Sequence, residues 1–123
     1  MSSLAADVRT LSLPIVTDVQ AQAGNIEDVG TNAPATGRRV SAQIDRLTTL
    51  LAVELMHAAQ AVDLRRAQRP SYDLGTGTAA LWRDFRKHVP YMDADRRNDV
   101  DIVRANDFLA QGQAGPARQA SLP

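Results

Sequence analysis

The stretch from Arg38 to Arg66 constrains the fold more than any other part of this sequence. It reads RRVSAQIDRLTTLLAVELMHAAQAVDLRR and contains neither glycine nor proline. Its apolar residues recur every three or four positions, as on one face of an α-helix with about 3.6 residues per turn. The pattern predicts one long central helix. We call its repeating face the apolar stripe: Val40, Ile44, Leu47, Leu51, Leu55, Ala58 and Val62.

The middle of this helix, LTTLLAVELMHAAQAV, is apolar on nearly all sides, with only Glu54, His57 and Gln60 as interruptions. Such a helix is expected to be buried on several sides rather than to lie on a surface. At roughly 1.5 Å per residue it would be about 43 Å long, which is too long for a compact chain of 123 residues to cover. We therefore expect other chains to pack against it.

The charge balance and the absence of cysteine exclude several classes of protein. The chain has 14 basic and 14 acidic residues, so a surface that binds nucleic-acid phosphates is not expected. Without cysteine it has no disulfide or thiolate metal site, which agrees with a cytoplasmic location. No run reaches the roughly 18 apolar residues of a membrane helix, and MSSLAADVR has no signal-peptide pattern. We expect no nucleic-acid and no membrane partner.

The residues before the helix, 1–37, are expected to form an extended or looped arm. Residues up to Leu11 show little periodicity, and LPIVTDV, from Leu13 to Val19, favours extended backbone because β-branched residues follow a proline. From Gln20 to Gly37 small residues, Asn and Gly predominate, which is typical of loops and turns. Thr36 is the expected N-cap of the long helix.

Two shorter helices are expected after the long one. The first, AALWRDFRKHVP, has Thr78 as a capping residue and Pro90 as its end. The second begins near Asn98 or Asp99, where acidic residues favour a helix N-terminus. Residues 111–123 are small, polar and aperiodic, and are expected to be a disordered tail. The predicted fold is all-α, with residues 38–110 as its helical segment.

Two places in the sequence are candidates for chemistry, and each has a simpler explanation. In the loop NIED, the carboxylates Glu27 and Asp28 beside Asn25 suit a cationic ligand, since loops often carry function; alternatively, they solvate an exposed turn. His57 could serve as a base near neutral pH, or it could be a packed residue with one hydrogen bond. Glu54 lies three residues before it, within reach on the helix face.

Three stretches taken together resemble a known family. They are VQAQAGNIEDVGT, ELMHAAQAVDLR and RKHVPYMDADRRNDVDI, and the similarity extends roughly from Leu13 to Leu109. The family is the aromatic amino acid lyases, which comprise the histidine and phenylalanine ammonia-lyases and related aminomutases, and the similarity is to their C-terminal part. The family's Glu-Leu, Cys-Gln-Ala and Asp-Leu-Arg are matched in turn by Glu54-Leu55, Ala59-Gln60-Ala61 and Asp63-Leu64-Arg65.

The resemblance implies a particular reaction. The family eliminates ammonia from histidine, phenylalanine or tyrosine, or shifts the amino group, with a methylideneimidazolone electrophile that forms from an internal Ala-Ser-Gly. The 123 residues contain no Ala-Ser-Gly, so this cofactor would have to come from a partner polypeptide. The family's active sites are assembled from several subunits of a helical homotetramer, which implies a homo-oligomer or a partner chain that carries the rest of the lyase.

The resemblance also assigns a substrate-binding residue. In histidine-type members the loop reads Asn-Gln-Glu-Asp and its Glu faces the substrate, and Glu27 occupies that position. Ile26 stands where the histidine-type members have Gln, and Ala23 stands where the phenylalanine-type members have an acid. The choice among aromatic amino acids therefore stays open. The residues expected to support Glu27 are Asn25, Asp28 and Gln20.

The sequence thus leads to one main hypothesis and two alternatives. The main hypothesis is a C-terminal segment or split subunit of an ammonia-lyase or aminomutase, which contributes the Glu27 loop and is inactive alone. The first alternative is a non-catalytic helical module that self-associates through the apolar stripe. The second is a degenerate fragment, which would aggregate because nothing covers its apolar surfaces.

Overall fold

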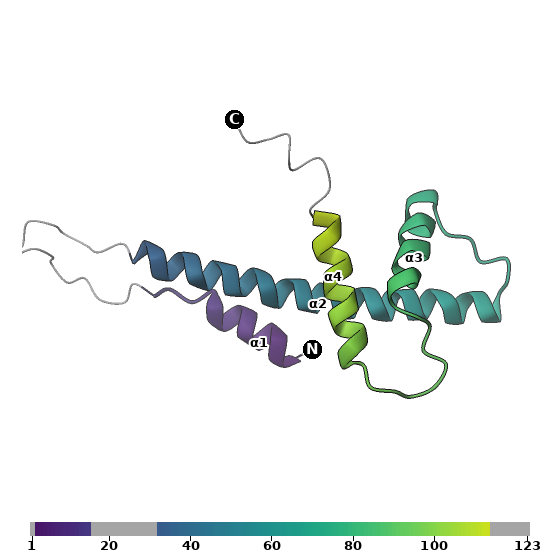
Figure 1. Cartoon of the computed structure of the whole chain (residues 1–123), viewed down its shortest axis with the longest axis horizontal. Helices are drawn as coiled ribbons and strands as arrows, with labels where there is room; N and C mark the ends of the chain where they lie inside the picture. The colour runs from purple at the N-terminus through teal and green to yellow at the C-terminus, as the bar shows by residue number, and fades with distance from the viewer. Residues whose placement is uncertain (1, 16–31, 114–123) are drawn as a thin grey trace, which may run out of the picture. The chain divides into compact units, whose positions relative to one another are not determined.

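A computed structural model describes residues 2–15 and 32–113 of the chain. It contains four helices, α1 (Ser2–Leu11), α2 (Ala33–Gln68), α3 (Thr76–His88) and α4 (Asp99–Gln113), and no strand within the described ranges. This confirms the all-α prediction, with one long helix followed by two shorter ones (Figure 1). The chain divides into two compact units, Met1–Leu47 and Thr48–Pro123, and α2 runs through both.

Helix α2 begins earlier than the sequence pattern predicted. It starts at Ala33 instead of Arg38, so residues 33–37 are helical and the prediction that they belong to a looped arm is wrong. The carbonyl of Asn32 accepts hydrogen bonds from the N–H groups of Ala35 (2.9 Å) and Thr36 (3.0 Å). Proline fits a first turn, because the N–H that it lacks would have no intrahelical partner there. Pro34 therefore does not interrupt the helix.

The N-terminal arm is the largest difference from the predicted fold. Residues Ser2–Leu11 form α1, whereas an extended or looped arm was expected. Its own sequence gave little reason for a helix, and side chains of α2 hold it in place by hydrogen bonds that are described with the candidate site. The predicted extended segment Leu13–Val19 shows no strand at residues 13–15, and its remainder lies outside the described residues.

The core of the second unit is built around small residues of α2. Ala52 (0% exposed) and Ala59 (4%) lie on the side of α2 where α3 and α4 pack, and their size allows a close approach. Phe85 of α3 is 0% exposed and meets Phe108 of α4 edge to face, with ring centroids 5.4 Å apart. Such a pairing of aromatic rings stabilises a core beyond the area it buries. The remaining buried apolar residues are Val89 and Ala105.

The apolar stripe is not the face that this core buries. Val40, Ile44, Leu47 and Leu51 are 48%, 53%, 41% and 52% exposed, while only Leu55 of the stripe packs against the core cluster. Large apolar side chains exposed in a row are typical of an interaction surface. Among the described residues, no helix is long and apolar enough to cross a membrane.

The two shorter helices agree with the predicted positions except at one end of each. Helix α3 begins at Thr76, so Thr78 lies inside it instead of capping it, and it ends before Val89 and Pro90 as predicted. Helix α4 begins at Asp99, with Asp99 and Asp101 in its first turn. It extends to Gln113, so residues 111–113 are helical and not part of a tail. Residues 114–123 lie outside the described residues.

Candidate functional site

The predicted substrate-binding loop lies outside the described residues, so the structure does not place Glu27, Asn25, Asp28 or Gln20. The elements on either side of this loop are described. Helix α1 precedes it and the first turns of α2 follow it, and the two helices lie side by side within the first unit (Figure 1). The contacts between these helices are described below.

Arg39 of α2 joins the two helices where α1 ends. Its Nη2 donates to the backbone oxygen of Thr10 at 2.7 Å and to that of Leu13 at 3.2 Å. Carbonyl groups in the last turn of a helix have no intrahelical partner, and the partial negative charge there favours a cation. Arg39 donates hydrogen bonds to these carbonyls and places its positive charge beside them. It does so although it lies 29 residues after Thr10 in the sequence.

Gln43, one turn further along α2, strengthens the same junction. Its Nε2 donates to the backbone oxygen of Val8 at 3.2 Å and to Oγ of Ser12 at 2.6 Å. The Ser12 hydroxyl donates in turn to the Val8 oxygen at 2.8 Å. Arg46 lies 3.8 Å from Asp7, and both side chains are more than half exposed, so that ion pair contributes little. The junction therefore depends chiefly on Arg39 and Gln43.

Arg39 was not among the functional residues predicted from the sequence. The sequence nevertheless contains an unusual charge pattern at this helix N-terminus. Helix α2 has no acidic residue in its first turn, and Arg38 and Arg39 lie in its second turn. Basic side chains near a helix N-terminus are unfavourable for the helix dipole. Their presence indicates a partner elsewhere, which for Arg39 is the end of α1.

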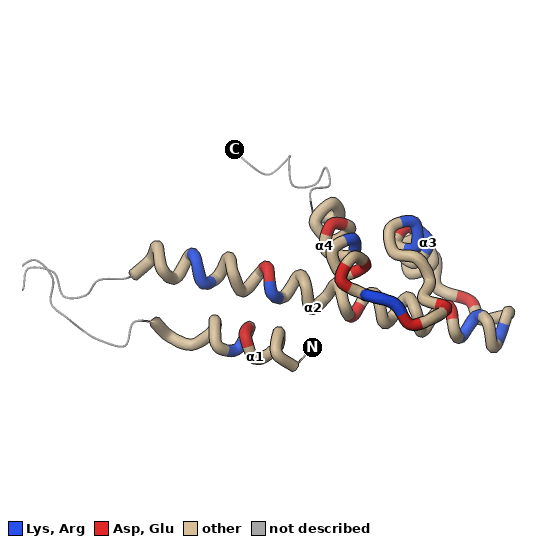
Figure 2. Tube along the Cα trace, turned by 60° about the horizontal axis from the view of Figure 1, so that its bottom comes forward, with Lys and Arg blue, Asp and Glu red and all other residues tan. Residues whose placement is uncertain are grey.

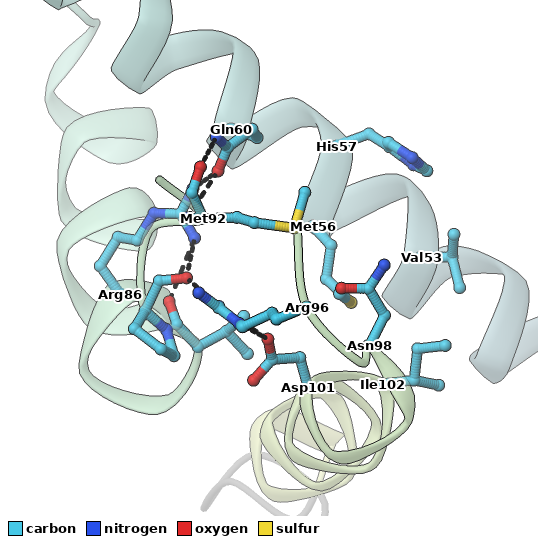
Figure 3. Close-up of a pocket in the computed structure, with 12 residues that line it drawn as sticks. Val53, Met56, His57, Gln60, Arg86, Met92, Arg96, Asn98, Asp101 and Ile102 are labelled. Atoms are coloured by element: carbon cyan, nitrogen blue, oxygen red, sulfur yellow. Dashed lines mark hydrogen bonds and ion pairs between the residues drawn. The ribbon is translucent and has the colours of Figure 1, made fainter. Parts of the chain in front are cut away.

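The second unit contains a small cavity between the second half of α2 and the connection from α3 to α4. It encloses about 120 Å³, and Figure 3 shows the side chains around it. Half of the lining is apolar and comes from Val53, Met56, Val89, Pro90, Met92 and Ile102. The other half is polar and comes from His57, Gln60, Arg86, Arg96, Asn98 and Asp101.

Arg86 is fully engaged by the protein itself. Its Nε donates to Asp63 at 2.7 Å, its Nη2 forms an ion pair with the same carboxylate, and the two side chains are 13% and 15% exposed. Its Nη1 donates to the backbone oxygens of Val89 (3.1 Å) and Pro90 (3.3 Å). Asp63 also accepts a hydrogen bond from the indole N–H of Trp82 at 3.0 Å. This guanidinium has little capacity left for a bound anion.

Arg96 and Gln60 hold the connection between α3 and α4 in a similar way. Arg96 donates twice to the carboxylate of Asp101, at 2.8 and 3.1 Å, and also to the Tyr91 backbone oxygen at 3.1 Å. Gln60 bonds both backbone groups of Met92, donating to its oxygen at 2.8 Å and accepting from its N–H at 3.2 Å. Asp101 is only 3% exposed. Along this connection, the acidic residues Asp93 and Asp95 precede the basic residues Arg96 and Arg97 (Figure 2).

The arginines that line this cavity therefore stabilise the fold, and we assign them no catalytic role. Their two guanidiniums face carboxylates and backbone oxygens of the protein itself. His57 is exposed, so the prediction of a packed histidine is wrong, and Figure 3 shows its ring turned away from the bonded pair Gln60 and Met92. Within residues 2–15 and 32–113, no group of side chains is arranged to hold a metal ion.

Comparisons with known proteins agree with the resemblance seen in the sequence. A sequence model of the family described as aromatic amino acid lyase matches residues 1–87. The histidine ammonia-lyase of Chloroflexus aurantiacus is 30% identical over 94% of this chain, and that of Myxococcus xanthus is 35% identical over 91%. The chain spans only 22% and 21% of the length of these relatives.

A solved structure shares the fold. It is the crystal structure of ergothionase, an ergothioneine-degrading enzyme from Treponema denticola, in complex with desmethyl-ergothioneine sulfonic acid. The TM-score is 0.79 at 30% identity, and the match covers 91% of this chain and 22% of that one. Since the family model matches well over half of the 123 residues, the chain belongs to the aromatic amino acid lyase family.

Proposed function

We propose that this chain acts as the C-terminal part of an aromatic amino acid ammonia-lyase and contributes the Glu27 loop to substrate binding. The observation that carries the proposal is the family match over residues 1–87, which includes the loop NIED and most of the helical segment. The histidine ammonia-lyases and ergothionase among the relatives favour a histidine-type substrate over phenylalanine or tyrosine. Migration of the amino group, as in an aminomutase, is the other reaction within this proposal.

The proposed role of Glu27 follows from the chemistry of a carboxylate. An ionised carboxylate only accepts hydrogen bonds, and it binds an imidazole N–H or an ammonium group in a charge-assisted way. Asn25, Asp28 and Gln20 are proposed to support the loop around it.

The electrophile is proposed to come from another polypeptide. No Ala-Ser-Gly occurs in the 123 residues, so this chain cannot form a methylideneimidazolone, and no bond-breaking step is assigned to its residues. When supplied by a partner, that group would provide the electrophile for loss of the amino group. A cytoplasmic location remains part of the proposal and rests on the cysteine-free composition.

The test mixes the purified full chain with a polypeptide that contains Ala-Ser-Gly and the remainder of a histidine ammonia-lyase. We expect the mixture, but neither part alone, to release ammonia from histidine and to form a conjugated acid that is followed by its ultraviolet absorbance. Glu27→Gln keeps the size of the side chain and removes its charge, so kcat/KM should fall about tenfold or more. The matched control is Asp107→Asn, at an exposed carboxylate of α4, which should behave as wild type.

Two results would count against this function. The first is a mixture that stays inactive on histidine, phenylalanine and tyrosine although both parts are folded. The second is activity that Glu27→Gln and Asp107→Asn leave equally unchanged. The first result removes the lyase role of this chain, and the second removes the role of Glu27 alone.

The exposed apolar stripe favours a second candidate, a helical self-association surface. Val40, Ile44 and Leu51 are all about half exposed on one face of α2, which suits packing against helices of other copies. Sedimentation of the isolated chain tests this, and a folded oligomer that Glu27→Ala leaves intact is the expected result. A folded monomer at all concentrations would contradict self-association.

A further inference from the structure

The connection cavity, between the second half of α2 and the connection from α3 to α4, lies on the side of α2 that faces away from the apolar stripe. Within the second unit, the stripe comprises Leu51, Leu55, Ala58 and Val62. The residues of α2 that line the cavity recur at helical spacing, about half a turn around the helix from these: Val53, Met56, His57 and Gln60. The surface of α2 that suits other chains is therefore not the surface that lines the cavity.

The arginines around the connection cavity are already paired within the protein. Arg86 donates to Asp63 at 2.7 Å, and Arg96 donates to Asp101 at 2.8 Å. Within residues 2–15 and 32–113, no buried side-chain nitrogen or oxygen atom lacks a hydrogen-bond partner. A bound ion would have to compete with these pairs, and a charge that is buried without a partner is costly. The cavity therefore favours a neutral ligand.

The apolar part of the lining suits one aromatic ring. Met56 of α2 and Met92 of the connection both line the cavity, and Figure 3 shows the Met92 side chain extending toward Met56. Thioether sulfur makes favourable contacts with aromatic rings, and the unbranched Met side chain adapts to their shape. The cavity encloses about 120 Å³. An apolar cavity of about 150 Å³ is sufficient to bind benzene, so the size also agrees with a single ring.

Asn98 places a polar group at the edge of the same cavity. It is exposed, it directly precedes α4, and Figure 3 shows it among the lining side chains. Its amide can both donate to and accept from a hydroxyl group. We propose that the connection cavity binds a small neutral molecule with one aromatic ring, held between Met56 and Met92, and a hydroxyl group directed at Asn98. This site does not depend on the proposed function of Glu27.

The first experiment titrates phenol into the full chain, labelled with 13C at its methionine methyl groups. Met56→Leu and Met92→Leu assign the two signals. A ring between the two thioethers changes the magnetic environment of both methyl groups, so we expect both signals to shift and to saturate. The dissociation constant should be on the order of 1 mM, as for a small fragment. Shifts that are absent, or that grow linearly with phenol concentration, would overturn the proposal.

A matched pair of substitutions tests whether phenol occupies this cavity. Val53→Phe adds a ring to the cavity wall, whereas Val100→Phe adds the same group at a residue of α4 that is 51% exposed and is not part of the lining. We expect Val53→Phe to raise the dissociation constant at least about tenfold and Val100→Phe to leave it unchanged. Equal weakening by the two would overturn the proposal. Ile102→Phe, on the α4 side of the cavity, replaces Val53→Phe if that variant does not fold, and the wild-type titration decides if neither folds.

Two further titrations test the class of ligand and the face of α2. Benzoate has the same ring with an ionised carboxylate, and it should bind at least about tenfold more weakly than phenol. Equal or tighter binding of benzoate would overturn the preference for a neutral molecule. In the mixture with the Ala-Ser-Gly polypeptide, phenol should still shift both methionine signals, and loss of these shifts would show that the partner fills the cavity and would reject a small-molecule site. A mixture that is inactive but binds phenol would reject the proposed function and leave this site established.

Discussion

The two units of this chain are held together in different ways. The second has a core with Phe85, Ala52 and Ala105 fully buried, and beside it a set of buried ion pairs. The first has no buried residue in α1 or in its part of α2, and its helices are joined by hydrogen bonds from Arg39 and Gln43. The second unit therefore buries an apolar core among its own residues, whereas the first buries none, and both leave large apolar side chains exposed.

This difference indicates where the chain depends on other polypeptides. Burial of apolar area is the dominant favourable contribution to folding, and the first unit obtains little of it from its own residues. Val40 and Ile44 are about half exposed there. The chain spans only 22% of the length of the Chloroflexus aurantiacus relative. The following predictions test the contrast, beginning with the largest effect.

The largest effect is expected in the core of the second unit. Phe85→Ala removes a ring that is 0% exposed and packed against Phe108, so unfolding free energy should fall by about 3–5 kcal/mol. Leu81→Ala on the same helix, at a residue 47% exposed, should cost about 1 kcal/mol or less. Urea denaturation followed by Trp82 fluorescence measures both. Equal losses would show that this core does not hold the unit together.

The next effect concerns the buried ion pair. Asp63→Ala leaves the guanidinium of Arg86 without its carboxylate and the Trp82 indole without its acceptor, at a loss of about 3 kcal/mol. Asp73→Ala, at an exposed carboxylate, is the control and should change stability by less than about 0.5 kcal/mol. Thermal denaturation of both variants measures the difference. A neutral Asp63→Ala would mean that the pair is dispensable.

A smaller effect is expected in the first unit, and it should depend on the partner. Leu47→Ala truncates a side chain that is 41% exposed, so the isolated chain should lose about 1 kcal/mol or less. In the mixture with the Ala-Ser-Gly polypeptide, the same substitution should weaken association by about tenfold, as for a buried leucine at an interface. Fluorescence titration measures the association. If Leu47→Ala leaves the association constant nearly unchanged, Leu47 stays exposed in the mixture as well.

The smallest effect concerns an exposed pair on α3. The hydrogen bond and the charge of Lys87, 2.6 Å away, lower the pKa of Asp84 below its ordinary value. Lys87→Gln should therefore raise the pKa of Asp84 toward that value without a measurable change in stability. An NMR titration of the Asp84 carboxyl carbon in both proteins tests this. An unchanged pKa in Lys87→Gln would show that the pair does not form in solution.

The sequence alone was sufficient to predict the long helix, but not helix α1 or the face of α2 that the core buries. Periodicity predicted α2 and the positions of α3 and α4, because these helices carry their own start and stop signals. Helix α1 was missed because bonds from Arg39 and Gln43, 26 to 35 residues away, stabilise it. Periodicity identified the apolar stripe but not the face of α2 that the core buries, since the buried residues there are the small Ala52 and Ala59.

The candidate site was predicted only in part. The spacing of NIED left a solvated turn as the simpler explanation, and the resemblance to the family was what singled out Glu27. Arg39 could not be found from local pattern, because its partners are backbone oxygens that no side-chain motif encodes. The only indication of Arg39 in the sequence was its position near the N-terminus of a helix, where a positive charge is unfavourable.

The contrast between the two units is tested most directly by hydrogen exchange of the full chain, alone and mixed with the Ala-Ser-Gly polypeptide. We predict that amides around Phe85 and Ala105 are protected in both states, and that those of residues 4–11 and 38–47 become protected only in the mixture. Equal protection of both regions in the isolated chain, or no gain on mixing, would contradict the account.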